Sequence, residues 1–83
     1  MTTWAVAHIG FERDKPTIGG LEVWNHKWRR VETPRIRLPH PAYPKQMHDY
    51  DIYEIGDEAQ PVRFAASELS NGVWGFYVPI YEM

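Results

Sequence analysis

The sequence has no cysteine among its 83 residues. This absence excludes disulfide bonds, thiolate zinc sites and a cysteine nucleophile. It is also typical of a reducing compartment, so we expect a cytoplasmic protein. Long apolar runs are missing too, because none approaches the roughly 18 residues that a membrane helix needs. The first apolar run stops at His8 and no basic segment precedes it, so we expect neither a secretory leader nor a membrane protein.

Motifs for catalysis and for cofactor binding are absent as well. The sequence contains no Gly-x-Ser-x-Gly, no phosphate-binding glycine loop and no dinucleotide fingerprint. The histidines and carboxylates of residues 40–51 match no known zinc or calcium spacing. We therefore predict that the protein is not an enzyme and that it holds no cofactor and no metal.

The length of the chain predicts a single small domain over residues 1–83. A chain of this length buries only about 60–65% of the surface that its unfolded form exposes, so the core is thin. Small domains gain stability from disulfides, from metals or from a second subunit. With disulfides excluded and no metal expected, formation of a homodimer remains one way to add buried surface.

The clearest structural signal lies at the C-terminal end. Apolar side chains alternate over residues 62–67 and again over residues 74–80, with Ser-Asn-Gly at 70–72 between them. This pattern predicts a β-hairpin. A three-residue loop sets Phe76 opposite Ala66 and so brings both apolar sets to one face, and it gives the loop glycine a left-handed conformation.

Two further segments, residues 4–9 and 48–55, also have strand patterns that end at a glycine. In the second segment the alternation slips between Ile52 and Tyr53, which indicates either a bulge or burial of both faces. Together these signals predict a mainly β fold. We expect a small antiparallel sheet of about five strands, curled into a partly open barrel.

Two segments are less regular. Residues 21–31 fit a hairpin that turns at Asn25-His26, and their valine and tryptophan content favours strands. The same residues place four apolar side chains on one stripe of a helix, so an α+β fold with one helix at 21–31 is the alternative. Residues 33–46 hold four of the seven prolines. Because each proline restricts its own backbone and that of its predecessor, we expect a proline-rich extended loop there.

Charge is distributed unevenly along the chain although the net charge is only −2. Residues 27–45 hold six cations and one anion, a net +5, whereas residues 46–83 hold one cation and seven anions, a net −6. A basic segment of this kind indicates a binding face for nucleic acid or for an acidic partner. Alternatively, the two segments lie side by side and neutralise each other.

Aromatic side chains interleave with the basic ones in the first of these segments. Stacking platforms beside cations are the means by which small barrels bind single strands, although a pI of about 6.0 is low for a dedicated nucleic-acid binder. The candidate partner-binding residues are Trp24, Trp28, Arg29, Arg30, Arg35, Arg37, Tyr43 and Lys45.

The chain has 4 Trp, 5 Tyr and 3 Phe, more large aromatics than a thin core can hide, so some are expected to form a contact patch. We therefore predict a small non-catalytic protein-binding or adapter module, with self-association as one form of that binding. The alternative is a single-stranded nucleic-acid-binding module that uses residues 24–45.

Overall fold

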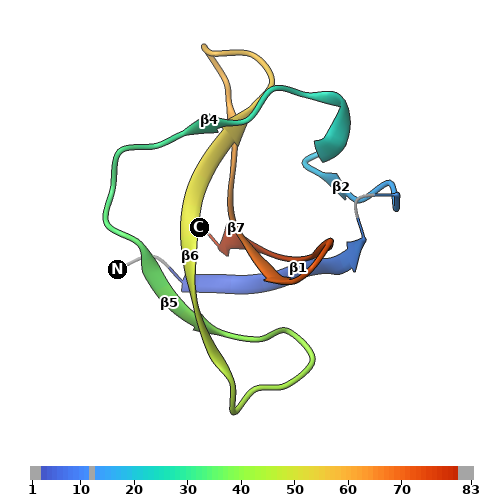
Figure 1. The fold of residues 1–83 in the computed structure, drawn as a ribbon. Coiled ribbons are helices and arrows are strands. Elements are labelled where there is room, and N and C mark those ends of the chain that lie inside the picture. Colours follow the sequence, from blue (N-terminus) through green and yellow to red (C-terminus); the bar gives the residue numbers. More distant parts are fainter. Residues whose placement is uncertain (1–2, 12, 81–83) are drawn as a thin grey trace.

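The computed structural model describes residues 3–11 and 13–80 of the chain. It is mainly β, and its strands pair antiparallel (Figure 1). The elements are β1 (Thr3–Phe11), β2 (Thr17–Ile18), β3 (Leu21–Glu22), the 3-10 helix η1 (Val23–Asn25), β4 (Arg29–Arg30), β5 (Ile36–Pro39), β6 (Met47–Ile55), β7 (Val62–Ser70) and β8 (Val73–Ile80). Over these residues there is no helix long and apolar enough to cross a membrane.

One six-stranded sheet dominates the fold. Its order is β1-β8-β7-β6-β4, and β5 pairs with β6 as well. In Figure 1, β4 lies beside one half of β6 and β5 beside the other half. The prediction of a mainly β antiparallel sheet is confirmed, with about six strands where about five were expected, and the described strands do not close into a barrel.

The predicted C-terminal hairpin is formed by β7 and β8. Phe76 lies opposite Ala66, which is the register that the sequence predicts. The turn itself contains only Asn71 and Gly72, because the third residue is accommodated as an irregularity of the ladder around Leu69. Gly72 has a φ of 76°, the left-handed conformation that a glycine adopts without strain.

The slip in the alternation of β6 comes from burial of both faces of the sheet. The ladder between β6 and β7 runs from Asp51 to Ile55 without a register shift, so no bulge is involved. Instead, Tyr50 and Ile55 are both fully buried, although they lie on opposite faces of the strand. Each belongs to a different core.

The two cores cover the two faces of the sheet. On one face Phe64, Ala66 and Phe76 pack with residues from the segment that contains β2, β3 and η1. On the other face Ala65 and Tyr77 pack with residues from β5 and from β1. The central strands are therefore covered on both sides, which accounts for much of the aromatic content of this short chain.

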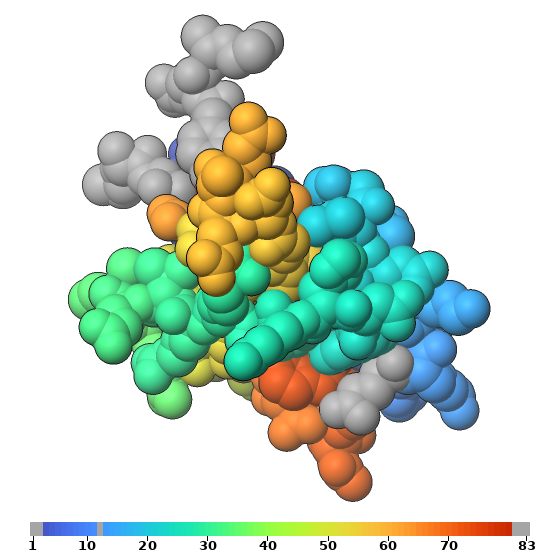
Figure 2. All heavy atoms as spheres, turned by 90° about the horizontal axis from the view of Figure 1, so that it is seen from above, coloured from blue at the N-terminus to red at the C-terminus, as the bar shows by residue number. Residues whose placement is uncertain are grey.

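Residues 21–31 form neither the predicted hairpin nor the alternative helix. Leu21–Glu22 pairs with β2, Val23–Asn25 makes a single 3-10 turn, and Arg29–Arg30 pairs with β6. The physical reason is that Trp24 and Trp28 both pack onto the first core, which one turn followed by extended chain allows. In Figure 2 the blue-green atoms of this segment extend across much of the face in view.

Part of the proline-rich segment 33–46 is a strand, because residues 36–39 pair with β6 as β5. The end of β5 is held to the second core at the carbonyl group of Pro39. The hydroxyls of Tyr50 and Tyr77 donate to the carbonyl oxygen of Pro39 at 3.0 and 2.7 Å. Within the loop that follows, Nδ1 of His40 accepts hydrogen bonds from the backbone N–H groups of Ala42 and Tyr43.

Candidate functional site

The eight predicted site residues do not form one surface. Trp24 and Trp28 stack on each other with ring centroids 5.1 Å apart and an interplanar angle of 15°. Both rings also meet Phe76 edge-on, at 5.7 and 5.9 Å. The Nε1–H of Trp28 donates to the carbonyl of Val23 at 2.8 Å. The two indoles are therefore half-buried parts of the first core and not free platforms for bases.

Three of the predicted arginines form ion pairs within the domain. Arg30 and Arg35 contact the carboxylate of Asp51 at 3.2 and 3.0 Å, and Arg37 contacts Asp49 at 3.3 Å. The arginine side chains remain more than half exposed. Because β4 and β5 lie along β6, the basic segment and the acidic strand neutralise each other. Of the two interpretations of the charge pattern, a binding face or neutralisation within the domain, these three ion pairs fit the second.

The remaining predicted residues lie elsewhere. Arg29 is half-buried on β4, and its Nη2 has no hydrogen-bond partner in the part of the chain that the structure describes. Tyr43 and Lys45 are exposed in the loop between β5 and β6, where the Tyr43 ring lies 4.9 Å from that of His40. In Figure 1 this loop and η1 lie at opposite ends of the view. The candidate residues therefore lie in different parts of the fold, and their role in partner binding stays a prediction.

A different feature is left open by the fold, namely the outer edge of β1. Among residues 3–11 and 13–80, β1 pairs with β8 on one side and with no strand on the other. The strand is nine residues long and carries no Asp, Glu, Lys, Arg or Pro. Three of its large apolar side chains are exposed: Val6 to 53%, Ile9 to 38% and Phe11 to 46%. Long uncharged edges of this kind are templates for pairing with another chain.

The hydrogen bonds of Phe11 show which backbone groups face outward. Its N–H donates to Oδ2 of Asp14 at 2.7 Å, and its carbonyl accepts from the N–H of Asp14 at 2.9 Å. Phe11 thus directs both backbone groups away from β8. In an antiparallel ladder alternate residues point the same way, so Ile9 also directs its N–H and C=O outward.

Val6 shares this orientation despite a shift in register. Its side chain and those of Ile9 and Phe11 lie opposite alternate residues of β8, which are Tyr77, Gly75 and Val73. The three side chains therefore lie on one face of the sheet, and their backbone groups point to the open edge. We call Val6, Ile9 and the backbone between them the β1 edge.

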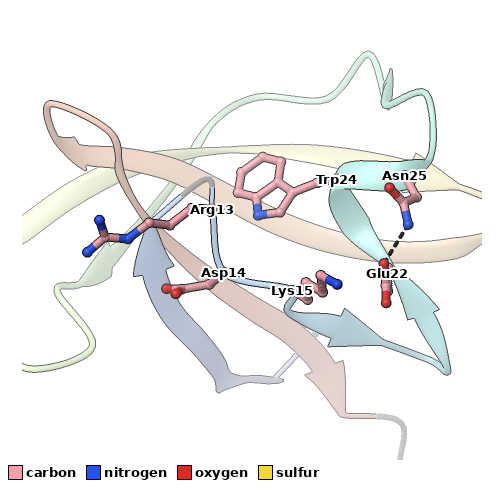
Figure 3. Close-up of a pocket in the computed structure, with 6 residues that line it drawn as sticks. All are labelled: Arg13, Asp14, Lys15, Glu22, Trp24 and Asn25. Carbon is pink, nitrogen blue, oxygen red and sulfur yellow. Dashed lines mark hydrogen bonds between the residues drawn. The ribbon is translucent and has the colours of Figure 1, made fainter.

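A hollow of about 280 Å³ lies beside the end of β1 (Figure 3). Its lining carries charges of both signs, and several of these groups contact neighbouring residues. Asn25 donates to the carboxylate of Glu22, Asp14 holds the backbone of Phe11, and the Arg13 guanidinium lies 4.9 Å from the centre of the Phe11 ring. The hollow therefore offers no concentration of one charge.

The titratable groups of the second core are perturbed in one direction. Burial, and then the neighbouring Tyr77, raise the pKa of Tyr50 to about 12, and burial raises the pKa of Tyr77. Both phenols therefore remain protonated donors to Pro39 under ordinary conditions. Among the residues that the structure describes, no group of three or more His, Asp or Glu side chains converges as a metal site would require.

The sequence predicted β1 as an apolar strand but did not point to its edge as a candidate site. The signal that points to it is the lack of any charge or proline over residues 3–11, since edge strands ordinarily carry such residues. That signal has meaning only once the strand is known to lie at an edge. No protein-family model, no curated protein and no solved structure matches this chain.

Proposed function

We propose that this protein is a small non-catalytic protein-binding module that takes up an extended polypeptide as an additional strand along β1. The observation that carries the proposal is the β1 edge, which combines outward backbone groups with the exposed side chains of Val6 and Ile9. In strand addition the backbone hydrogen bonds provide affinity and alternate side chains provide specificity. The β1 edge has both elements.

The opposite edge of the sheet supports this assignment by contrast. There β4 is only two residues long and consists of Arg29–Arg30, and β5 carries Arg37 and Pro39. Short length, cations and proline are the features by which proteins protect an edge from unwanted pairing. The edge formed by β4 and β5 therefore carries cations and a proline, whereas β1 carries neither and its only irregularity is the register shift between Val6 and His8.

Binding of single-stranded nucleic acid through residues 24–45 ranks second. Arg35 and Arg37 would have to exchange their contacts with Asp51 and Asp49 for phosphates, and the two carboxylates would remain beside the bound strand. The stacked faces of Trp24 and Trp28 are occupied by each other. Both features oppose the stacking and charge neutralisation that such binding needs.

A selection from random peptides tests the proposal. We expect peptides about as long as β1, which has nine residues, to be enriched in uncharged, apolar sequences. Their binding should shift the amide resonances of Val6 and Ile9, and the variant Val6→Lys/Ile9→Lys should abolish it. The matched control Tyr43→Lys/Met47→Lys adds the same charge at exposed apolar positions of the β5–β6 hairpin, and binding should persist.

The contrary result is also clear. If the selected peptides bind equally well to Val6→Lys/Ile9→Lys, the β1 edge is not the binding site. If their binding is instead lost in Arg35→Ala/Arg37→Ala, the function belongs to the basic segment.

A further inference from the structure

We infer that the strand added to β1 is β1 of a second copy of this chain, so that two sheets join about a two-fold axis. The inference rests on the proposed function, because it takes the β1 edge as the binding edge. Three properties of that edge favour a second copy over an unrelated extended peptide. They are its irregular spacing, its lack of charge and the position of its apolar side chains.

The spacing of the outward groups is the first property. The ladder between β1 and β8 shifts register between Val6 and His8, so β1 holds one extra residue there. The outward residues Val6 and Ile9 are consequently three positions apart, whereas a regular strand presents outward groups at every second residue. A regular peptide would therefore have to accommodate the extra residue as β8 does, where Tyr77 and Gly75, two positions apart, lie opposite Val6 and Ile9.

A second copy has the matching irregularity. In an antiparallel pair about a two-fold axis, Val6 lies opposite the partner's Ile9 and Ile9 lies opposite the partner's Val6. The segment between these residues has the same length in both strands. The hydrogen bonds at both ends can therefore form together, with the two extra residues accommodated symmetrically.

The absence of charge is the second property. At a two-fold interface a strand meets its own sequence, and like charges directly opposite each other destabilise a pair of strands. From Thr3 to Phe11 the strand contains no Asp, Glu, Lys or Arg. Its one titratable side chain, His8, lies toward the first core, with its ring 6.4 Å from that of Phe76. Self-pairing of β1 therefore brings no like charges together.

The apolar side chains are the third property. A two-fold axis perpendicular to the sheet leaves the same face of each sheet on the same side. The exposed side chains of Val6, Ile9 and Phe11 in one copy thus adjoin those of the other copy and lose contact with water. Asp14 already occupies the backbone of Phe11 and so ends the paired segment at that residue.

Sedimentation equilibrium tests the inference on the full chain. We expect the wild type to change from monomer to dimer within a series from about 1 µM to about 300 µM. Val6→Lys/Ile9→Lys should raise the dissociation constant at least about 100-fold, because it removes apolar burial from both subunits and opposes like charges. The control Tyr43→Lys/Met47→Lys should leave the dissociation constant within about threefold of the wild type. Far-ultraviolet circular dichroism establishes that each variant is folded.

A charge-exchange experiment identifies the occupant as a second copy. Val6→Lys/Ile9→Lys and Val6→Glu/Ile9→Glu should each be monomeric alone, and their equimolar mixture should form a heterodimer. A wild type that stays monomeric at the highest concentration overturns the inference, and so does a dimer that the β1 variants do not weaken. If the wild type is monomeric but selected peptides still bind β1, only this inference fails. If no peptide binds β1 either, the proposed function fails as well.

Discussion

The anchoring of the proline-rich segment to the second core gives a quantitative prediction. Tyr50 and Tyr77 both donate their hydroxyl protons to the carbonyl oxygen of Pro39, at 3.0 and 2.7 Å. Their rings meet edge-on with centroids 5.2 Å apart, and their exposed fractions are 0% and 4%. Replacing either residue by phenylalanine removes one hydrogen bond and preserves the ring packing.

The expected free energies of unfolding follow from how many donors the carbonyl retains. In Tyr50→Phe or Tyr77→Phe the Pro39 oxygen keeps one donor, so each single change should cost about 1 kcal/mol. In the double variant the oxygen has lost both donors, which adds a desolvation penalty of about 1–3 kcal/mol. The double change should therefore cost about 3–5 kcal/mol, more than the sum of the two single changes.

Thermal unfolding followed by circular dichroism measures the effect. For a domain of this size 1 kcal/mol corresponds to about 4–8 °C in Tm, so the coupling is readily resolved. Tyr43→Phe is the matched control, because Tyr43 is 61% exposed and should tolerate the change. Strictly additive losses would refute the reasoning, since they would mean that water replaces the phenols at Pro39.

Three further predictions concern the turn, the pH dependence and the basic segment. Gly72→Val should cost about 1–3 kcal/mol in urea unfolding, because a β-branched residue resists the φ of 76°; an unchanged midpoint would contradict the turn geometry. Because burial raises the pKa of Tyr50 to about 12 from 10.0, the stability due to this neutral phenol is complete below about pH 10 and falls as the pH rises towards about 12. Tyr50→Phe should lack this part of the loss of folding stability at alkaline pH. Identical pH profiles of stability for the wild type and Tyr50→Phe would contradict the prediction. Arg35→Ala/Arg37→Ala should change stability by less than about 1 kcal/mol. Fluorescence anisotropy should detect no oligonucleotide binding by the wild type even at low salt, and a salt-dependent affinity that the double variant weakens would restore the nucleic-acid hypothesis.

The part of the fold that the sequence predicted is local. The alternation over residues 62–67 and 74–80 defined a hairpin, and its apolar pattern set Phe76 opposite Ala66, as observed. The apolar pattern alone restricted the register, because the turn holds two residues where three were predicted. The pairing of β1 with β8 links the two ends of the described chain. No local pattern records such a pairing, and without it the β1 edge could not be predicted.

Residues 21–31 illustrate a second limit. Helix and strand patterns both fitted them, and packing of Trp24 and Trp28 on the sheet favoured neither. The charge pattern also allowed two interpretations. Positions along the sequence do not show whether Arg35 and Arg37 contact a ligand or an acidic strand of the same domain. Their contacts with β6 depend on the path of β5, which tertiary structure determines.

The two edges of the sheet differ in how their charged and backbone groups are satisfied, and this difference is the basis of the proposed function. Arg30 and Arg35 attract attention in the sequence, but their carboxylate partner, Asp51, lies on the neighbouring strand. The β1 strand attracts little attention, yet its outward N–H and C=O groups at Val6 and Ile9 lack a partner strand in the described structure. Backbone groups that are satisfied by water in the isolated domain can bond to a second strand at little cost, while the exposed apolar side chains beside them gain by leaving water. Under the proposed function, the free energy of association would therefore come mainly from the uncharged edge.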